Sequence, residues 1–252
     1  MDLERLGAAE LAERFLNWFA EFSGESRVDS LIHHYIAYRA VVRLKVACMR
    51  WAQGDDASAD TARQLVELAL AHLRRAEPRL IIIGGSPGTG KSTVAAGLAG
   101  RFAGVLIRSD RLRKERSGLT PELRAAESWR VGLYAPAVTE ATYGELISRA
   151  RLLLGQGETV VIDASWSDSA LRARAREAAA TRFSLVSELR CCAPPEVADD
   201  RIQRRESTDP SDATPELARL MERAFDAWPE ASELSTTASL PVTLDQAASL
   251  VT

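Results

Sequence analysis

One short stretch of the sequence combines glycines with a lysine and a serine at a spacing that suits phosphate binding. Residues 85–92 read GSPGTGKS, match the pattern G-x-x-x-x-G-K-[ST] in full, and follow the apolar run 80–83. Glycines let the backbone curl so that successive N–H groups face phosphate oxygens, and the helix that follows adds the positive end of its dipole. In such a loop Lys91 reaches the β- and γ-phosphates, and the hydroxyl of Ser92 ligates Mg²⁺. The stretch therefore predicts a binding site for a nucleoside triphosphate with Mg²⁺.

A carboxylate and an arginine follow the next predicted strand. Asp110 and Arg113 stand at the carboxyl end of the apolar run 104–109, where open α/β sheets keep their ligand crevice. The carboxylate can accept the proton of an attacking hydroxyl, and the arginine can hold an anionic group. All three histidines precede residue 77, so proton abstraction near the loop must fall to a carboxylate. The alternative is that Asp110 caps a helix whose arginines are solvated.

A second carboxylate, Asp163, ends the apolar run 159–163. The carboxyl ends of parallel strands share one edge, so Asp163 is expected to face the phosphates or the acceptor of a reaction. The alternative is an aspartate that caps a helix or is satisfied within the core. Trp166, three residues on, is expected to pack in the core rather than to border an acceptor pocket.

A basic helix end precedes a polar segment late in the chain. Arg201 and Arg205 belong to the run RIQRR at residues 201–205, which residues 206–212 follow with mostly polar side chains. This pattern suits a lid that closes arginines over a phosphoryl group and excludes water. The alternative is a solvated charged face. Arginines at 172, 174 and 176 are expected at the surface.

The elements that must position these residues alternate from residue 79 onward. Predicted strands span 79–84, 104–109, 158–163, 183–192 and 240–244, and predicted helices lie near 91–102, 121–130, 137–154, 168–180, 195–206 and 214–226. Apolar strands separated by helices indicate a parallel sheet that is covered on both faces.

The first 76 residues read as helical throughout. A break at 54–56 precedes a predicted helix from Thr61 to Arg75, with Asp60 or Thr61 as its N-cap and with Pro78 after its end. We expect a helical region at 1–76 and an α/β domain at 79–252. The helical region carries more apolar side chains than water tolerates, so we expect its helices to pack and some remaining surface to favour self-association.

Composition sets broad limits on the class of protein. The chain has 252 residues, a formal net charge of −3 and three cysteines. The charge disfavours a nucleic-acid substrate, and the cysteines supply neither a disulfide framework nor a C-x-x-C metal clip. No apolar run reaches the length of a membrane span. We expect a cytoplasmic protein that does not bind membranes.

Together these motifs resemble the P-loop kinases of small acceptors, a group that includes polynucleotide 5′-hydroxyl kinase, chloramphenicol phosphotransferase, gluconate kinase and zeta toxin. The resemblance covers about residues 79–245 and rests on the loop 85–92, on Ser109-Asp110-x-x-Arg113, on the run 161–166, and on Arg201-x-x-x-Arg205 with residues 211–213. It implies a P-loop NTPase three-layer sandwich with a five-stranded parallel sheet, with ATP and Mg²⁺ as cofactors.

The resemblance also implies roles for individual residues. Asp110 would activate the acceptor hydroxyl, Asp163 would bind the acceptor or metal-bound water, and Arg205 would close on the phosphates. The expected catalytic residues are thus Lys91, Asp110 and Arg205, and the expected acceptor-binding residues are Asp110, Arg113 and Asp163. The expected Mg²⁺ ligands are Ser92 and Asp163. The expected nucleotide-binding residues are Gly85, Ser86, Pro87, Gly88, Thr89, Gly90, Lys91, Ser92, Thr93, Arg201 and Arg205.

A narrower likeness covers the whole chain. Residues 35–47 resemble the end of an aminoglycoside-phosphotransferase-like domain, which certain bacterial proteins fuse to such a kinase. Residues 1–76 lack the His-x-Asp catalytic loop of that domain and its metal-binding aspartate. If the likeness holds, the region is only the tail of such a domain and has no catalysis of its own.

We therefore expect ATP-dependent transfer of the γ-phosphoryl group to a hydroxyl of a small acceptor. The competing class is a nucleotide-hydrolysing regulatory switch, but Asp163 precedes Ala-Ser-Trp rather than a second acidic residue, and no guanine-reading N-K-x-D occurs. A third class is a degenerate nucleotide-binding module. Basic residues at 108, 111, 113, 114 and 116 keep a polynucleotide 5′-hydroxyl kinase as an alternative.

Overall fold

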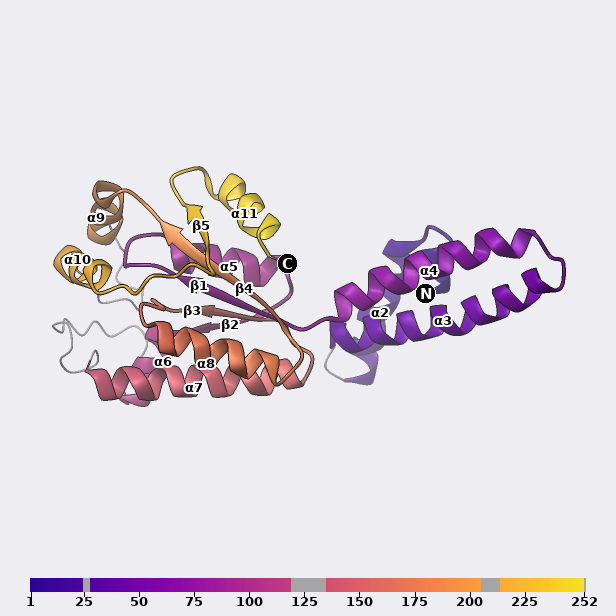
Figure 1. Ribbon diagram of the computed structural model, residues 1–252, viewed down its shortest axis with the longest axis horizontal. Coiled ribbons are helices and arrows are strands. Elements are labelled where there is room, and N and C mark those ends of the chain that lie inside the picture. Colours follow the sequence, from indigo (N-terminus) through magenta and orange to yellow (C-terminus); the bar gives the residue numbers. More distant parts are fainter. Residues whose placement is uncertain (25–27, 119–134, 205–213, 252) are drawn as a thin grey trace. The chain divides into compact units, whose positions relative to one another are not determined.

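The computed structural model describes residues 1–24, 28–118, 135–204 and 214–251. The chain divides into two compact units, Met1–Glu77 and Pro78–Thr252, which are described separately (Figure 1). Within the described ranges, no helix is both long and apolar enough to cross a membrane.

Unit 1 is helical, with α1 at Asp2–Arg5, α2 at Ala9–Ser23, α3 at Asp29–Ala52 and α4 at Ala57–Ala76. Helices α3 and α4 pack along each other around a small core of Ala40, Ala47, Leu65 and Ala69. Helix α4 begins at Ala57, so the predicted start at Thr61 was wrong. The hydroxyl of Ser58 donates to the carboxylate of Asp55 at 2.7 Å and fixes this earlier first turn. Asp60 lies within that turn instead of capping it.

Unit 2 contains a five-stranded parallel sheet, as the sequence predicted. Its strands are β1 (Arg79–Gly84), β2 (Val105–Arg108), β3 (Val160–Asp163), β4 (Leu185–Cys192) and β5 (Ser232–Ser235), in the order β2-β3-β1-β4-β5. Residue 163 pairs with residue 83 of β1 and with residue 108 of β2. The carboxyl ends of the three strands that carry the candidate site therefore lie at one edge.

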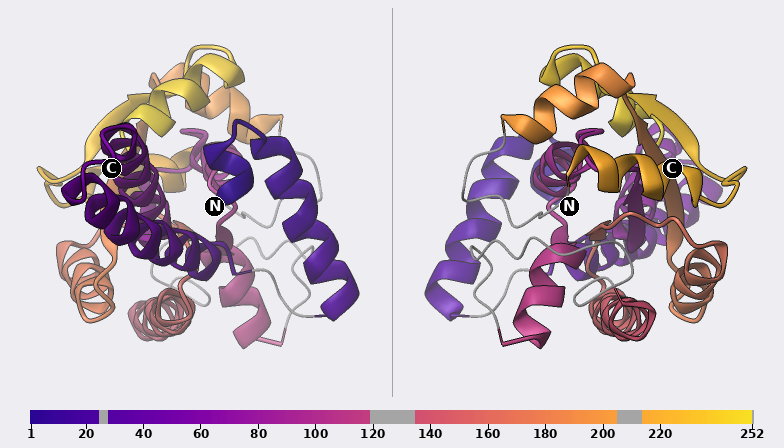
Figure 2. Two further views of the ribbon diagram at one scale, coloured as in Figure 1. Left: turned by 90° about the vertical axis from the view of Figure 1, so that its right-hand side faces the viewer. Right: turned by 90° about the vertical axis from the view of Figure 1, so that its left-hand side faces the viewer.

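Helices cover both faces of this sheet. One face packs against α7 (Pro136–Gly155) and α8 (Ser169–Ala180), and the other packs against α5 (Lys91–Arg101) and α11 (Leu240–Ser249) (Figure 1). Helix α6 (Ser109–Arg116) follows β2 directly. Helices α9 (Pro195–Gln203) and α10 (Pro215–Arg223) lie at the end of the unit that faces the viewer in the right panel of Figure 2. The arrangement is the three-layer sandwich that the motifs implied.

The prediction of a strand at 240–244 was wrong. This segment begins α11, and the fifth strand lies earlier, at Ser232–Ser235. Pro241 stands in the first turn of the helix, where its missing N–H is not needed, and the buried residues Thr243 and Ala247 are spaced by one helical turn. In β5 only Leu234 is a large apolar residue, so the strand has almost no hydrophobic signal.

Helix α6 was not predicted as a separate element, and the predicted helix at 121–130 lies outside the described residues. The expectation that Arg172 is a surface residue was also wrong. Its guanidinium is buried, donates to the carbonyls of Trp166 and Ala227 at 2.6 Å each, and lies over the ring of Trp228. Two carbonyl acceptors and an aromatic face make burial of this cation tolerable.

Candidate nucleotide and acceptor site

The glycine-rich loop between β1 and α5 is held in a conformation that requires glycine. Gly85 has a φ of 135° and Gly88 a φ of 82°, both in the region that side chains disfavour. A Cβ on Gly85 would lie 2.5 Å from the carbonyl oxygen of Cys191, and one on Gly88 would lie 2.5 Å from that of Ala198. The loop is thus pressed against β4 and α9. Among the described residues, no side chain caps the N-terminus of α5, and an uncapped helix N-terminus is suited to bind an anion.

Two side chains far away in the sequence fasten the loop from outside. Thr236, just after β5, donates from Oγ1 to the carbonyl of Thr89 at 2.7 Å. Arg201 of α9 donates to Oγ1 of Thr236 at 2.9 Å, to the Thr236 carbonyl at 2.6 Å and to the Gly88 carbonyl at 3.5 Å. The predicted nucleotide-binding residue Arg201 therefore lies against the loop.

A buried group of charges forms where the loop meets the ends of β2 and β3. Asp163 has a side chain that is 4% exposed, and Arg108 donates from Nε to its Oδ2 at 3.1 Å. Burial raises the pKa of Asp163 above its ordinary value, while Lys91, the hydroxyl of Ser92 and Arg108 oppose that rise. Lys91 and Ser92, the lysine and serine of the loop motif, thus lie beside this carboxylate.

These residues fit a magnesium ion. The second carboxylate oxygen of Asp163, Oδ1, is buried and has no hydrogen-bond partner among the described residues. A hydroxyl next to a carboxylate supplies the hard oxygen ligands that Mg²⁺ prefers, and this ion usually completes its shell with water and substrate phosphates. Ser92 and Asp163 are therefore the residues that would hold it.

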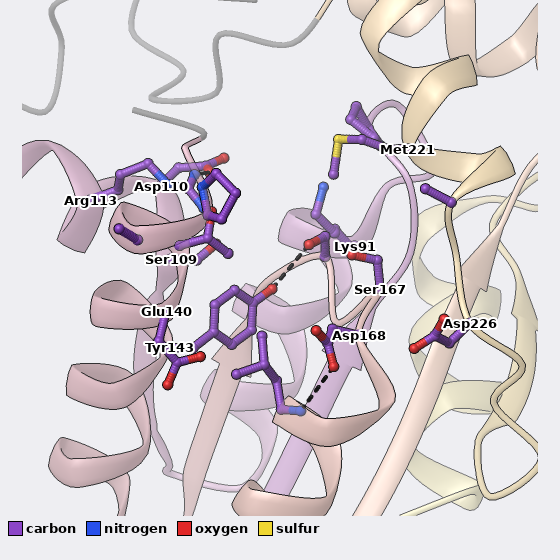
Figure 3. Close-up of a pocket in the computed structure, with 17 residues that line it drawn as sticks. Lys91, Ser109, Asp110, Arg113, Glu140, Tyr143, Ser167, Asp168, Met221 and Asp226 are labelled. Carbon is purple, nitrogen blue, oxygen red and sulfur yellow. Dashed lines mark hydrogen bonds and ion pairs between the residues drawn. The ribbon is translucent and has the colours of Figure 1, made fainter. Parts of the chain in front are cut away.

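A cavity of about 580 Å³ opens beside Lys91 on the side of α6, α7 and α8. Asp110 and Arg113 line it from α6, and Arg113 donates from Nη1 to Oδ1 of Asp110 at 2.9 Å. The side chain of Arg113 is 8% exposed, so the alternative of solvated arginines behind a capping aspartate does not apply to it. Figure 3 shows this pair on the α6 side of the cavity, with Lys91 between it and Met221 of α10.

A second cavity, of about 400 Å³, lies on the other side of the loop. Lys91 lines this cavity as well as the first, and it is joined there by Gly90, Ser92 and Thr93 of the loop region and by Arg201 and Thr236. The loop therefore stands between two chambers, and its lysine reaches both.

Tyr143 of α7 ties the wall of the first cavity to the segment after β3. Its buried phenol accepts a hydrogen bond from the backbone N–H of Trp166 at 3.0 Å and shares one with the hydroxyl of Ser165, also at 3.0 Å. The carbonyl of Ser165 in turn accepts from the N–H of Gly85 at 3.1 Å. Trp166 is fully buried against Tyr143, as the core interpretation expected.

The structure places most of the predicted site residues around these two chambers. Lys91, Ser92, Asp110, Arg113 and Asp163 gather at one edge of the sheet. Arg205 and the residues 211–213 lie outside the described residues. The nucleotide-binding residues of the loop and Arg201 lie as described above.

Sequence reasoning missed Tyr143, Thr236 and Arg108. Tyr143 sits inside a long helix with no motif around it, and Thr236 follows the strand that lacked a hydrophobic signal. Arg108 was seen only as part of a basic run. Its register position opposite Asp163 could have suggested the ion pair, since both residues end neighbouring parallel strands.

The basic residues at 108–116 do not form one exposed surface. Arg113 and Lys114 are buried, Arg108 is paired with Asp163, and the exposed Arg111 is paired with Glu115 at 3.2 Å. Of the residues that suggested a polynucleotide substrate, Arg111 and Arg116 are the exposed ones.

Comparison with known proteins identifies curated relatives of this chain. Over 240 residues the chain is 42% identical to the uncharacterized proteins Rv2004c of Mycobacterium tuberculosis (strain ATCC 25618 / H37Rv) and Mb2027c of Mycobacterium bovis. The alignment covers 94% of this chain and 47% of each relative, so the chain spans about half the length of the curated relatives it matches.

Several solved structures with a similar fold are kinases. A sugar kinase from Janibacter sp. HTCC2649 has a TM-score of 0.53 at 19% identity, over 69% of this chain and 94% of that chain. A gluconokinase from Sinorhizobium meliloti 1021 has 0.51 at 16% identity, over 69% and 91%. The APS kinase CysC of Mycobacterium tuberculosis has 0.51 at 17% identity, over 69% and 97%. At these identities the likeness shows the fold alone, which is that of P-loop kinases.

A protein-family model also matches this chain. The model of the family AAA_33, described as an AAA domain, matches residues 80–228, which include the loop, both aspartates and the helices around the first cavity. This match spans more than half of the chain. The chain therefore belongs to the AAA_33 family of AAA domains.

Proposed function

We propose that unit 2 is an ATP-dependent kinase that transfers the γ-phosphoryl group of ATP to a hydroxyl of a small acceptor. The observation that carries this proposal is the place of Lys91, which lines both the chamber on the nucleotide side of the loop and the chamber that contains Asp110. A kinase needs two adjoining sites, whereas a nucleotide-hydrolysing switch needs only one site and a water molecule.

Each residue then has a task that follows from its surroundings. Lys91 binds the β- and γ-phosphates and neutralises the charge that develops on them. Asp110, held by Arg113, accepts the proton of the acceptor hydroxyl and orients it for attack. Mg²⁺, when bound by Ser92 and Asp163, supplies further neutralisation of the phosphates. Arg205 remains our proposed closing arginine, and Arg201 supports the loop.

Positioning supplies most of the catalysis in phosphoryl transfer, so the supports of the loop matter. The contacts of Thr236 and Arg201 fix its outer side, and Gly85 is tied to Ser165, which Tyr143 holds. These contacts prepare the loop before any ligand arrives.

The two alternatives have less support. For a regulatory ATPase, no acidic residue directly follows Asp163, and hydrolysis would not use the cavity beside Asp110. For a polynucleotide kinase, two of the five basic residues at 108–116 are buried. A screen of labelled γ-phosphate transfer from ATP to sugars, antibiotics, nucleosides and oligonucleotides distinguishes the three, with ATP hydrolysis measured alongside.

Two wider expectations also stand as proposals. We place the protein in the cytoplasm, whose reducing conditions suit the free thiols of Cys48, Cys191 and Cys192. We propose that unit 1 is the tail of an aminoglycoside-phosphotransferase-like domain, in keeping with relatives that are about twice as long as this chain.

A further inference from the structure

We propose that the acceptor is a small organic cation that carries a hydroxyl, of the chemical class of amino alcohols and amino sugars. This inference rests on the proposed kinase function and concerns the cavity of about 580 Å³ beside Lys91. Cavities of this size, between about 300 and 1,000 Å³, hold small molecules. The charges that line the cavity decide which kind of molecule it suits.

Both described cations of the lining already face carboxylates. Lys91 acts on Asp163 and belongs to the phosphate loop, and Arg113 is bonded to Asp110 at 2.9 Å. The lining also carries the carboxylates of Glu140, Asp168 and Asp226. Of these three, Glu140 is paired with Arg174. The other two, Asp168 and Asp226, lie away from the pair of Asp110 and Arg113 and set the charge of that part of the cavity (Figure 3).

Both of these carboxylates are held by backbone N–H groups at the start of α8. Asp168 accepts from the N–H of Ala170 at 2.7 Å and of Leu171 at 3.3 Å, and Asp226 accepts from the N–H of Ser169 at 2.8 Å. The Ser169 hydrogen bond lowers the pKa of Asp226, so this group stays ionised at neutral pH.

Solvent and the N-terminus of α8, rather than a cationic side chain, stabilise these two exposed charges. Within the described part of the chain, neither Asp168 nor Asp226 has a lysine or arginine at ion-pair distance. A helix N-terminus counts for roughly half a positive charge, which two carboxylates outweigh. The nearest cation that acts on Asp226, Arg172, gives its guanidinium hydrogen bonds to two carbonyls instead. An ammonium group on the acceptor would place a positive charge beside these two carboxylates.

The rest of the lining suits a hydroxyl-bearing carbon skeleton. Hydroxyl groups come from five side chains, and apolar contacts come from α8 and α10 through Leu171 and Met221. The hydroxyl-bearing residues are Ser109, Thr139, Tyr143, Ser165 and Ser167. A negatively charged acceptor would meet Asp168, Asp226 and the triphosphate together, and the described lining offers it no cation that lacks a carboxylate neighbour.

Three hexose probes of equal size test the charge preference: glucosamine, glucose and glucuronate. Their binding to the full chain is measured by saturation-transfer NMR titration, both without nucleotide and with a non-hydrolysable ATP analogue. Glucosamine is expected to bind at least about tenfold more tightly than glucuronate, with glucose between them. Equal binding of the three, binding of none, or a preference for glucuronate overturns the proposal.

A double variant and a matched control test whether Asp168 and Asp226 cause this charge preference. In the double variant Asp168→Asn and Asp226→Asn, the amide oxygens can still accept the backbone hydrogen bonds, while both charges are gone. The ratio of glucosamine to glucuronate affinity should fall to near one, and it should keep its wild-type value in Asp245→Asn, a charge removal on α11 outside the cavity. A double variant that keeps the wild-type ratio also overturns the proposal. ATP binding is measured separately, by calorimetry. If the chain does not bind ATP, the proposed kinase function is wrong, while the charge preference of the cavity can still be measured with the three probes.

Discussion

The guanidinium of Arg113 holds the carboxylate of Asp110 at 2.9 Å, one helical turn away on α6, with both side chains facing the cavity that Lys91 also lines. The pair fixes the direction of the carboxylate, because the 8% exposed arginine has little freedom to move. A general base that is held in place loses less free energy on reaching the transition state than a mobile one.

Replacement of this arginine should affect the chemistry and spare nucleotide binding. Arg113→Lys keeps the positive charge but loses the planar guanidinium that orients Asp110. We expect kcat for phosphoryl transfer to fall by roughly ten- to a hundredfold, since small misplacements of catalytic groups carry costs of that order. The Kd for ATP, measured by calorimetry, should stay at the wild-type value. A variant with weakened ATP binding and unchanged kcat would place Arg113 on the nucleotide side instead.

Magnesium-dependent binding of ATP should depend on pH through Asp163. Burial raises the pKa of this carboxyl, so it takes up a proton at a higher pH than an ordinary aspartate, whose pKa is 3.8. The protonated form is a poor ligand for Mg²⁺. As pH falls, the gain in ATP affinity that Mg²⁺ provides should therefore disappear before ordinary aspartates titrate.

Titration calorimetry of ATP at several pH values, with and without Mg²⁺, measures this gain. Asp163→Asn should abolish most of it at every pH and so remove its pH dependence. Asp245→Asn, which changes an exposed aspartate on α11, should leave the profile as it is in the wild type. An Asp163→Asn variant with a full magnesium effect would place the metal elsewhere.

Unit 1 should associate with itself through α2. Leu11, Phe15, Trp18 and Phe22 are spaced by three or four residues and are 54, 58, 51 and 85% exposed, so they form one apolar stripe along the helix. Stripes of this kind are typical of contact surfaces. Sedimentation velocity should show an oligomer whose fraction rises with concentration. Trp18→Ser with Phe22→Ser should shift it to monomer, and Glu21→Gln on the same helix should not. A wild-type chain that stays monomeric at high concentration would contradict this expectation.

The sequence was most informative where local geometry and chemistry coincide. Residues 85–92 specify a turn, a helix start and a phosphate ligand at once, and Asp110 and Asp163 follow apolar strands whose parallel order brings their ends together. Five parallel strands were predicted, although one was placed wrongly. Strand β5 has a single large apolar residue, so its sequence does not indicate a strand. The apolar residues Leu240 and Val242 suggested a strand instead, but Pro241 between them lies in the first turn of α11.

Long-range partners were beyond this reasoning. The burial of Arg172 depends on carbonyls at positions 166 and 227, and the support of the loop depends on Thr236, which is 147 residues from Thr89. Neither set of contacts produces a recognisable pattern in the sequence around Arg172 or Thr236. Tyr143 belongs to the same class, because its partners at 165 and 166 come from a different element.

The central claim is that Lys91 binds the nucleotide and Asp110 acts on the acceptor across one shared cavity. The most direct test compares ATP affinity with the rate of phosphoryl transfer in Lys91→Ala and Asp110→Asn, using the acceptor found in the transfer screen. Lys91→Ala should lose productive ATP binding while its circular dichroism stays that of the wild type. Asp110→Asn should bind ATP normally and transfer about 10²–10⁴ times more slowly, the usual contribution of a positioned general base. Near-normal transfer by Asp110→Asn, or wild-type ATP affinity in Lys91→Ala, would contradict the account.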